Sequence, residues 1–357
     1  MKPTMPEVSS DTPATARLAK WIASLKRPDI PAPAWAHAKL CLLDGLGCAL
    51  FGSQQPWGRI AAETAKDLSP NGRASLLGHD ARCGVDAAAM ANGTATHGFE
   101  LDDIHLRATI HPGAVTIPTA LALAEAYNKT PADFLTAVVA GYEVGLRIGM
   151  AVGLGHGLRG HHATGTIGTL AAAATGANLL GLSAEQTSDA LGIAATQAAG
   201  LHGARTGAMS KRFHAGRAAQ SGVLAAALAK RGFTGSRTAL EQPFGGFFST
   251  LCDNVDTPAA YAELGERWEI MEVGFTSRPV DGEPNNFVCD LGIFPAIILD
   301  PAAKTTTVAI KVDSVSDFLA VHNLSKSAIH GEPFSQLRFA TAFEGAPGDA
   351  GASMMVI

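Results

Sequence analysis

Acidic and imidazole side chains are concentrated in one short stretch of the chain, residues 97–113. It reads H-G-F-E-L-D-D-I-H-L-R-A-T-I-H-P-G and lies in alanine-rich, apolar surroundings. Burying ionisable groups is costly, and carboxylates and imidazoles are the groups that transfer protons near neutral pH. The stretch therefore predicts a site for acid–base chemistry. Its candidate residues are Glu100, Asp102, Asp103, His105 and His111.

A second stretch carries the opposite charge. Residues 190–240 hold seven Lys or Arg residues and no Asp or Glu, although the whole chain has a net charge of −5. Cations without acids beside them in the sequence are suited to bind an anionic ligand; a solvated basic turn is the alternative. The candidates for carboxylate binding in this stretch are Lys211, Arg212 and His214. Together, the two stretches predict an active site for a polycarboxylate.

Two further histidines, His161 and His162, lie in the glycine-rich run G-L-G-H-G-L-R-G-H-H-A-T-G at residues 153–165. Imidazoles in a loop that leads into a helix N-terminus can contact an anion that the free backbone N–H groups bind. Solvated loop histidines are the alternative interpretation. No predicted strand precedes the run, which therefore does not match a dinucleotide-binding fingerprint.

A metal site is a competing interpretation of residues 97–113, because histidine and carboxylate are common metal ligands. Its candidate ligands are His97, Asp102, Asp103, His105 and His111. No two histidines in the stretch have the i, i+4 spacing of a helical zinc motif. We therefore predict no metal, and a metal-dependent hydrolase stays an alternative. Capping of a helix by one of the aspartates is another. The Gly-x-Ser-x-Gly motif of serine hydrolases is absent from the sequence.

The elements that position these residues are predicted to be mainly helices. Apolar spacing and capping residues predict helices over residues 14–25, 33–51, 57–68, 85–98, 117–127, 131–152, 166–180, 184–199 and 217–231. Residues 73–78 and the β-branched run at 305–312 are predicted strands. The predicted fold class is therefore mainly α: a large all-helical domain and a smaller α+β portion.

The predicted domain boundaries follow this change in composition. Residues 1–12 are a disordered lead-in, residues 13–251 the helical domain, and residues 252–330 the α+β portion. Residues 331–357 hold a partial return helix and a frayed tail.

The composition of the chain indicates which partners it can bind and in which compartment it occurs. The net charge of −5 argues against a nucleic-acid binder, which needs a broad basic face. No apolar run is long and uninterrupted enough to span a bilayer, and the N-terminus lacks the pattern of a secretory signal. The five scattered cysteines form no C-x-x-C pair and fit a reducing compartment. We expect a cytoplasmic protein that binds neither membrane nor nucleic acid.

Five ordered motifs connect the chain to a known family. They are L-L-D-G-L-G-C-A-L at 42–50, H-G-F-E-L-D-D with I-H-P-G at 97–113, G-H-H-A-T-G at 160–165, G-A-M-S-K-R-F-H-A-G-R-A-A at 207–219, and G-F-T-G with E-Q-P-F-G-G-F-F at 232–248. In these motifs the chain resembles the MmgE/PrpD family, which includes 2-methylcitrate dehydratase, cis-aconitate decarboxylase and iminodisuccinate epimerase.

The resemblance implies a large helical domain, an α+β lid, a homodimer and chemistry without a cofactor. The family's acid region falls on Glu100, Asp102 and Asp103, its two histidines on His111 and His162, and its lysine on Lys211. The implied catalytic residues are His111, His162, Lys211 and Asp102. The implied substrate-binding residues are Glu100, Asp103, His161, Arg212 and His214.

The C-terminal part departs from the family pattern. Val273-Gly274-Phe275 begins a G-F-K-x-Y-type segment, but Thr276-Ser277-Arg278-Pro279 replaces its continuation and no tyrosine follows. The lid is therefore predicted to be shortened. We expect a lyase of the 2-methylcitrate dehydratase type, which removes a proton α to a carboxylate and releases water. The alternatives are a cis-aconitate decarboxylase-like lyase, an iminodisuccinate epimerase-like isomerase, and a non-catalytic carboxylate-binding relative.

Overall fold

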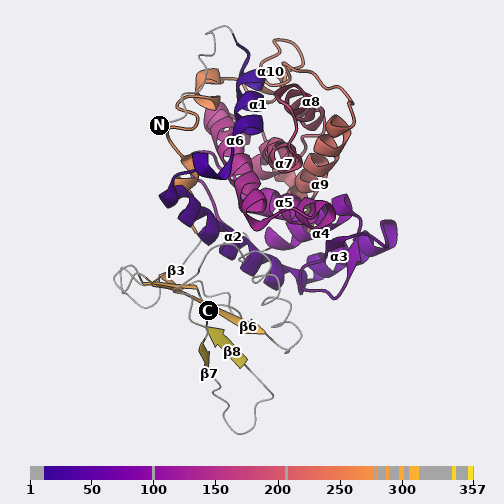
Figure 1. The fold of residues 1–357 in the computed structure, drawn as a ribbon, viewed down its shortest axis with the longest axis vertical. Helices are drawn as coiled ribbons and strands as arrows, with labels where there is room; N and C mark the ends of the chain where they lie inside the picture. The colour runs from indigo at the N-terminus through magenta and orange to yellow at the C-terminus, as the bar shows by residue number, and fades with distance from the viewer. Residues whose placement is uncertain are drawn as a thin grey trace. The chain divides into compact units, whose positions relative to one another are not determined.

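The structure is a computed structural model that describes residues 12–98, 101–205 and 208–275, together with six strands between residues 278 and 356. The chain divides into two units, residues 1–275 and 276–357, each described here by itself (Figure 1). The boundary lies later than the predicted one at residue 251, because residues 252–275 pack onto the helices and bury Trp268, Ile270 and Val273 in their core. The predicted lead-in, apart from Thr12, lies outside the described residues.

The first unit is built from helices, and this confirms the mainly α fold class. Its helices are α1 (Ala14–Ser24), α2 (Ala32–Ser53), α3 (Pro56–Leu68), α4 (Val85–Thr96), α5 (Gly113–Tyr127), α6 (Pro131–Leu158), α7 (Ala163–Leu180), α8 (Ala184–Ala195), α9 (Ser210–Lys230) and α10 (Phe247–Leu251). A short hairpin, β1 (Ala74–Ser75) with β2 (Arg82–Cys83), lies between α3 and α4. Short 3-10 turns cover Arg27–Asp29, His202–Arg205, Thr257–Ala260 and Glu269–Glu272.

Local sequence signals fix several helix starts correctly. The predicted starts at residues 131 and 184 are those of α6 and α8, where Thr130 and Ser183 are the N-caps and each forms a capping box. Other boundaries differ from the prediction. α5 begins at Gly113 rather than at residue 117, and α9 begins at Ser210 rather than at residue 217. The glycine-rich run is only partly a loop, because α6 continues to Leu158 beyond a kink at Gly153, which has a φ of 58°.

Close helix packing places the ends of α4, α5, α7 and α9 near one another. Figure 1 shows α7 in the middle of the helical unit, and its residues are almost all buried. Small residues allow the closest approach. A Cβ built on Gly216 of α9 would lie 2.2 Å from the carbonyl oxygen of Met90 in α4, so only glycine fits there. This contact holds the first turns of α9 beside the C-terminal end of α4.

The second unit contains an antiparallel sheet of order β3-β4-β5-β6-β8-β7. Its strands are β3 (Arg278–Pro279), β4 (Phe287–Val288), β5 (Ile297–Asp300), β6 (Thr305–Val312), β7 (Ala340–Ala342) and β8 (Ser353–Val356). β6 coincides with the strand predicted at 305–312. β7 and β8 are strands where a return helix and a frayed tail were expected, because β8 pairs with both β6 and β7. The rest of residues 331–357 lies outside the described residues.

Two helices, α2 and α6, are long and apolar enough to cross a membrane by length and composition, which the sequence analysis did not expect. Of the apolar window in α6, 83% is buried inside the helical unit, against 44% in α2. Packing against neighbouring helices therefore accounts for the apolar composition of α6.

A buried ion pair fastens residues 262–270 to α6. Arg147 is fully buried, lies 3.3 Å from Glu143, and donates hydrogen bonds to the carbonyl oxygens of Ala262 and Arg267. Glu143 in turn accepts a 2.9 Å hydrogen bond from the N–H of Ile270. Burial raises the pKa of Glu143 to about 7 despite its cationic partner.

Arg147→Met is expected to lower the free energy of unfolding by about 3–5 kcal/mol, because it leaves a buried acid and several carbonyls without their donor. Urea unfolding measures this. Arg231→Met is the control, since the exposed guanidinium of Arg231 donates only to the Ala227 carbonyl oxygen of α9 among the described side-chain contacts. Its expected change is within about 0.5 kcal/mol. Equal losses in both variants would contradict the role of Arg147.

Candidate active site

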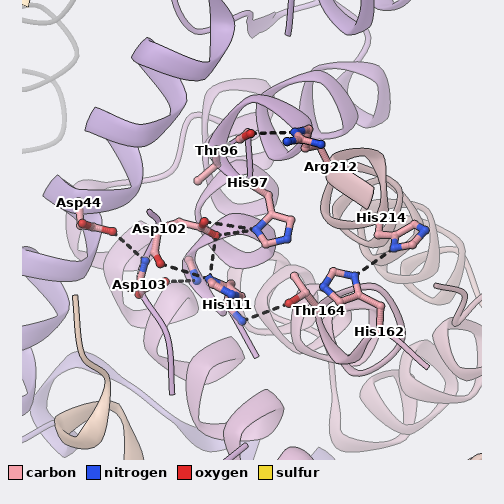
Figure 2. Close-up of polar contacts among 12 residues, drawn as sticks. Asp44, Thr96, His97, Asp102, Asp103, His111, His162, Thr164, Arg212 and His214 are labelled. Carbon is pink, nitrogen blue, oxygen red and sulfur yellow. Dashed lines mark hydrogen bonds and ion pairs between the residues drawn. The ribbon is translucent and has the colours of Figure 1, made fainter. Parts of the chain in front are cut away.

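Four helix ends deliver the candidate residues to one place. His97 is the C-cap of α4, His111 lies two residues before α5, and His162 is the N-cap of α7. Lys211 and Arg212 lie in the first turn of α9, and His214 follows them. Figure 2 shows His97, His111 and His162 side by side, with Asp102 beside the first two. The early start of α9 thus places its basic residues on a helix rather than in a turn.

Asp102 lies between two imidazoles. Its Oδ2 is 2.9 Å from Nδ1 of His97 and 3.4 Å from Nδ1 of His111, and the same His111 nitrogen is 3.2 Å from the Asp102 carbonyl oxygen. Burial alone raises the pKa of Asp102, but the neighbouring His97 and His111 outweigh it and hold that pKa below its ordinary value. Asp102 therefore remains a carboxylate that orients both rings.

His162 forms a second pair with His214. Their Nδ1 atoms are 3.0 Å apart, and the ring of His162 stacks at 5.5 Å and 26° on that of His97. Burial, followed by the charges of His97, His214 and Lys211, lowers the pKa of His162 to about 2. His162 is therefore neutral in the empty site, and one Nδ1 of this pair donates its proton to the other.

Lys211 supplies a buried positive charge beside these rings. It is only 6% exposed. Its charge contributes to the lowered pKa values of His111, His162 and His214, in each case after the larger effect of burial. The site thus combines one carboxylate, the imidazoles of His111, His162 and His214, whose pKa values are lowered, and one ammonium group. In these low-dielectric surroundings electrostatic interactions are strong.

Comparison with known proteins identifies the family. Residues 16–258 match the MmgE/PrpD N-terminal domain. The chain belongs to the MmgE/PrpD family. This confirms the resemblance carried by the five motifs, whose residues include those of the site.

Three similar proteins are named as cis-aconitate decarboxylases or as a protein like them. A cis-aconitate decarboxylase-like protein of Aspergillus oryzae is 38% identical over 74% of this chain and 59% of its own length. Cis-aconitate decarboxylase of Aspergillus terreus is 34% identical over 72% of this chain and 55% of its own. The human cis-aconitate decarboxylase is 32% identical over 66% of this chain and 50% of its own. The chain thus spans about half to three fifths of each relative's length.

In this MmgE/PrpD chain, the Asp103 side chain is hydrogen-bonded within the fold. It is fully buried, and its carboxylate accepts hydrogen bonds from the Gly113 N–H at 3.0 Å and the Tyr142 hydroxyl at 2.5 Å. Its own N–H donates to Asp44. Burial raises the pKa of Asp103 to about 7. These bonds tie Asp103 to the start of α5 and to α6. The substrate-binding role of Asp103 stays a prediction.

Arg212 is partly engaged within the fold. Its guanidinium donates to the carbonyl oxygens of Gly98, at 2.9 Å, and Ala208, at 3.3 Å, and lies 4.4 Å from the ring centre of Trp57. These contacts fix the turn after His97. A carboxylate-binding role for Arg212 stays a prediction.

The predicted basic stretch does not form one anion-binding face. Arg237 pairs with Asp189 at 2.9 Å, and Lys230 lies over the ring of Tyr127. Asp189 lies one position before the acid-free stretch, so it does not count among the acids of that stretch. It nevertheless provides Arg237 with an ionic partner. Among the described side chains of the stretch, Lys211 and Arg212 are the cations beside the imidazole cluster.

The other predicted residues lie elsewhere. His161 stacks on His156, with ring centres 4.9 Å apart. The Nδ1 of His105 accepts a hydrogen bond from Ala108, and its ring faces Glu269. Glu100 lies outside the described residues.

Three residues in the site are also possible metal ligands. The ligand atoms of His97, Asp102 and His111 all lie within 4.8 Å of one another, and His97 and Asp102 are fully buried. Hydrogen bonds from Nδ1 of His97 and of His111 to Asp102 already explain why these atoms lie so close together. A site without metal stays a prediction, and elemental analysis of the purified protein tests it.

Sequence reasoning missed some members of the cluster. His97 was considered only as a metal ligand, and His202, whose ring centre is 5.8 Å from that of His162, was not considered. His156, which bonds to Thr166 in α7, was also missed. The sequence feature that these residues share is that each lies in or near one of the histidine-containing motifs of this alanine-rich chain. Without the fold, that signal does not show which rings meet.

Acid should destabilise this unit through its buried neutral histidines. His156 is 1% exposed, and its nitrogens lie 2.7 Å from Thr166 Oγ1 and 3.3 Å from the Leu251 carbonyl oxygen. Burial lowers its pKa from 6.5 to about 4. The unfolded chain therefore binds a proton below pH 6.5 that the folded chain does not bind. The associated stability is complete above pH 6.5 and is lost as the pH falls toward 4.

Urea unfolding between pH 7 and pH 4 measures this loss. Each such histidine contributes a slope of at most about 1.4 kcal/mol per pH unit. His156→Gln is expected to reduce the slope by about one proton, while His162 still contributes in the same direction. An unchanged slope in His156→Gln would refute the assignment.

Proposed function

We propose that this chain carries the active site of a cofactor-independent lyase for a small di- or tricarboxylic acid, and that it decarboxylates cis-aconitate. The observation that carries the proposal is the buried Lys211 ammonium group beside His111 and His162, with His111 in contact with the Asp102 carboxylate. The printed names of the fungal and human relatives support decarboxylation. Dehydration of 2-methylcitrate, our first expectation from the sequence, becomes the alternative.

The reaction needs one proton and a place for negative charge. Loss of CO2 from the carboxylate on the saturated carbon of cis-aconitate leaves an electron pair. This pair shifts through the adjacent double bond toward the carbon that bears the far carboxylate. Protonation of that carbon yields an unsaturated five-carbon diacid. The site must therefore hold the carboxylates, stabilise the transferred charge and deliver a proton.

The residues of the site match these tasks. Lys211 offers a positive charge to a carboxylate and a proton to the carbon. His111 and His162 are neutral in the empty site, but a bound tricarboxylate raises their pKa values by its negative charge, so either ring gains acid character on binding. Asp102 orients His111 through Nδ1, and Nε2 of that ring is then the atom available for proton transfer.

An NMR time course with purified protein tests the proposal. The protein is incubated with cis-aconitate, 2-methylcitrate, citrate and iminodisuccinate. Consumption of cis-aconitate with release of CO2 supports decarboxylation. Conversion of 2-methylcitrate or iminodisuccinate instead would select the dehydratase or epimerase alternative. Thermal stabilisation by citrate without turnover of any acid would support a non-catalytic binder.

Two accompanying measurements test the remaining parts of the proposal. Stoichiometric zinc or iron in the purified protein would favour the metal-dependent alternative. We also propose that the chain forms a homodimer, and sedimentation equilibrium would show a single monomeric mass if it does not.

A further inference from the structure

The imidazole of His97 has no structural task that explains its burial at the end of α4. The helix cap is made by its backbone, since the His97 N–H donates to the carbonyl oxygens of Gly93 and Ala95. The side chain is fully buried. An apolar ring of similar size would fill the space without the cost of burying polar nitrogens. The reason for an imidazole must therefore lie in its contacts.

Those contacts are with three proposed site residues at once. Nδ1 of His97 faces both carboxylate oxygens of Asp102, at 2.9 Å and 3.3 Å. Its ring meets His111 edge-on at 4.8 Å and 61°, and lies nearly parallel to His162 at 5.5 Å and 26°. One buried ring thus touches the carboxylate and both histidines of the site (Figure 2).

The hydrogen bond to Asp102 decides where the proton of His97 lies. Because Asp102 is ionised, Nδ1 of His97 must carry the hydrogen of this bond, and Nε2 is the second nitrogen of the ring. This Nε2 is buried and has no hydrogen-bond partner among the described residues. In Figure 2 it lies on the side of the ring away from Asp102.

We propose that His97 is a positioning residue of this site. It fixes the Asp102 carboxylate, which together with its own carbonyl oxygen accepts the Nδ1 hydrogen of His111. It thereby holds His111 in the tautomer whose Nε2 is free for proton transfer, and its face sets the plane of His162. The role in turnover rests on the proposed function, whereas the tautomer of His111 does not.

The activity test compares three substitutions. The side-chain amide of His97→Asn can replace the Nδ1 hydrogen, whereas that of His97→Gln reaches the place of Nε2 and His97→Phe donates no hydrogen bond. With cis-aconitate, His97→Phe and His97→Gln are expected to lower kcat by about 10- to 100-fold at nearly unchanged KM. His97→Asn should stay within about threefold of the wild type.

A purely structural role predicts a different pattern. If the role is purely structural, the loss of activity in each variant should parallel its loss of melting temperature, and the pH profile of kcat should be unchanged. The positioning role predicts a shifted profile in His97→Phe. The ionisable groups around the ring are Asp102, His111, His162 and His214, and Lys211 is the nearby cation. Full activity of His97→Phe, or no rescue by a folded His97→Asn, would overturn the proposal.

Nitrogen NMR of ¹⁵N-histidine-labelled protein tests the proposal without turnover. In the wild type, His97 and His111 should both carry their hydrogen on Nδ1, and in His97→Phe the His111 tautomer should become mixed. An Nε2–H form of His97, or the same His111 tautomer in both proteins, would overturn the proposal. If the wild type converts no acid, the proposed function fails while these spectra still decide the role of His97.

Discussion

Lys211→Ala is expected to lower kcat for cis-aconitate by about a thousandfold, within the range by which general acid–base groups accelerate reactions. The substitution removes the buried ammonium group that lies beside His111, His162 and His214. Both the charge that holds a carboxylate and a proton donor are then lost. KM should rise as well, because binding in the ground state uses the same charge.

Two further lysine variants sharpen this prediction. Lys230→Ala is the matched control, because Lys230 lies on the same helix α9 but contacts Tyr127 away from the site; its kcat should be unchanged. Lys211→Arg keeps the positive charge but cannot release a proton near neutral pH. Recovery of KM without recovery of kcat in Lys211→Arg would assign the proton to Lys211. Near-normal turnover of Lys211→Ala would remove Lys211 from the mechanism.

Asp102→Asn is expected to lower kcat by about a hundredfold to a thousandfold, since an amide in place of an orienting carboxylate leaves a catalytic histidine in the wrong tautomer. The Asp102 carboxylate receives Nδ1 of His97 at 2.9 Å and faces that of His111 at 3.4 Å. An asparagine offers only one acceptor oxygen to these two donors. The pKa of His111 should also fall further, because Asp102 is the charge that raises it.

The measurement for Asp102→Asn is the pH dependence of kcat together with the melting temperature. Asp133→Asn is its control, because Asp133 makes an exposed capping contact with Thr130 at the start of α6. Asp133→Asn should leave kcat unchanged. A folded Asp102→Asn variant with wild-type kcat would show that the carboxylate does not orient His111 for the reaction.

Local signals predicted much of the fold. The helix starts after Thr130 and Ser183 and the β-branched run of β6 were correct, because each depends on neighbours in the sequence. The start of α9 was not predictable in this way. Lys211 and Arg212 precede Gly216, which a local reading treats as a break in a helix. In the structure Gly216 lies inside α9, where it packs closely against Met90 and Thr94 of α4.

The residues of the candidate site were named from the sequence, but their contacts were not. His111, which the family resemblance implied as catalytic, lies near Asp102, and the charge of Lys211 acts on His111 and His162. Their catalytic roles stay predictions. The contact between His162 and His214 joins residues that are 52 positions apart, and no local pattern reveals it. Asp103 resembles Asp102 in sequence, but its bonds to Gly113 and Tyr142 assign it to the fold. The two neighbouring aspartates thus have different hydrogen-bond partners.

The most direct test of the central claim is the reaction of cis-aconitate in D2O, followed by NMR with the wild type and Lys211→Ala. We predict that the wild type releases CO2 and places one solvent deuteron on the carbon that receives the shifted electron pair. Lys211→Ala should be about a thousandfold slower. A folded wild type that leaves cis-aconitate unchanged, or equal rates in the two proteins, would contradict the proposal that this imidazole and lysine site performs the decarboxylation.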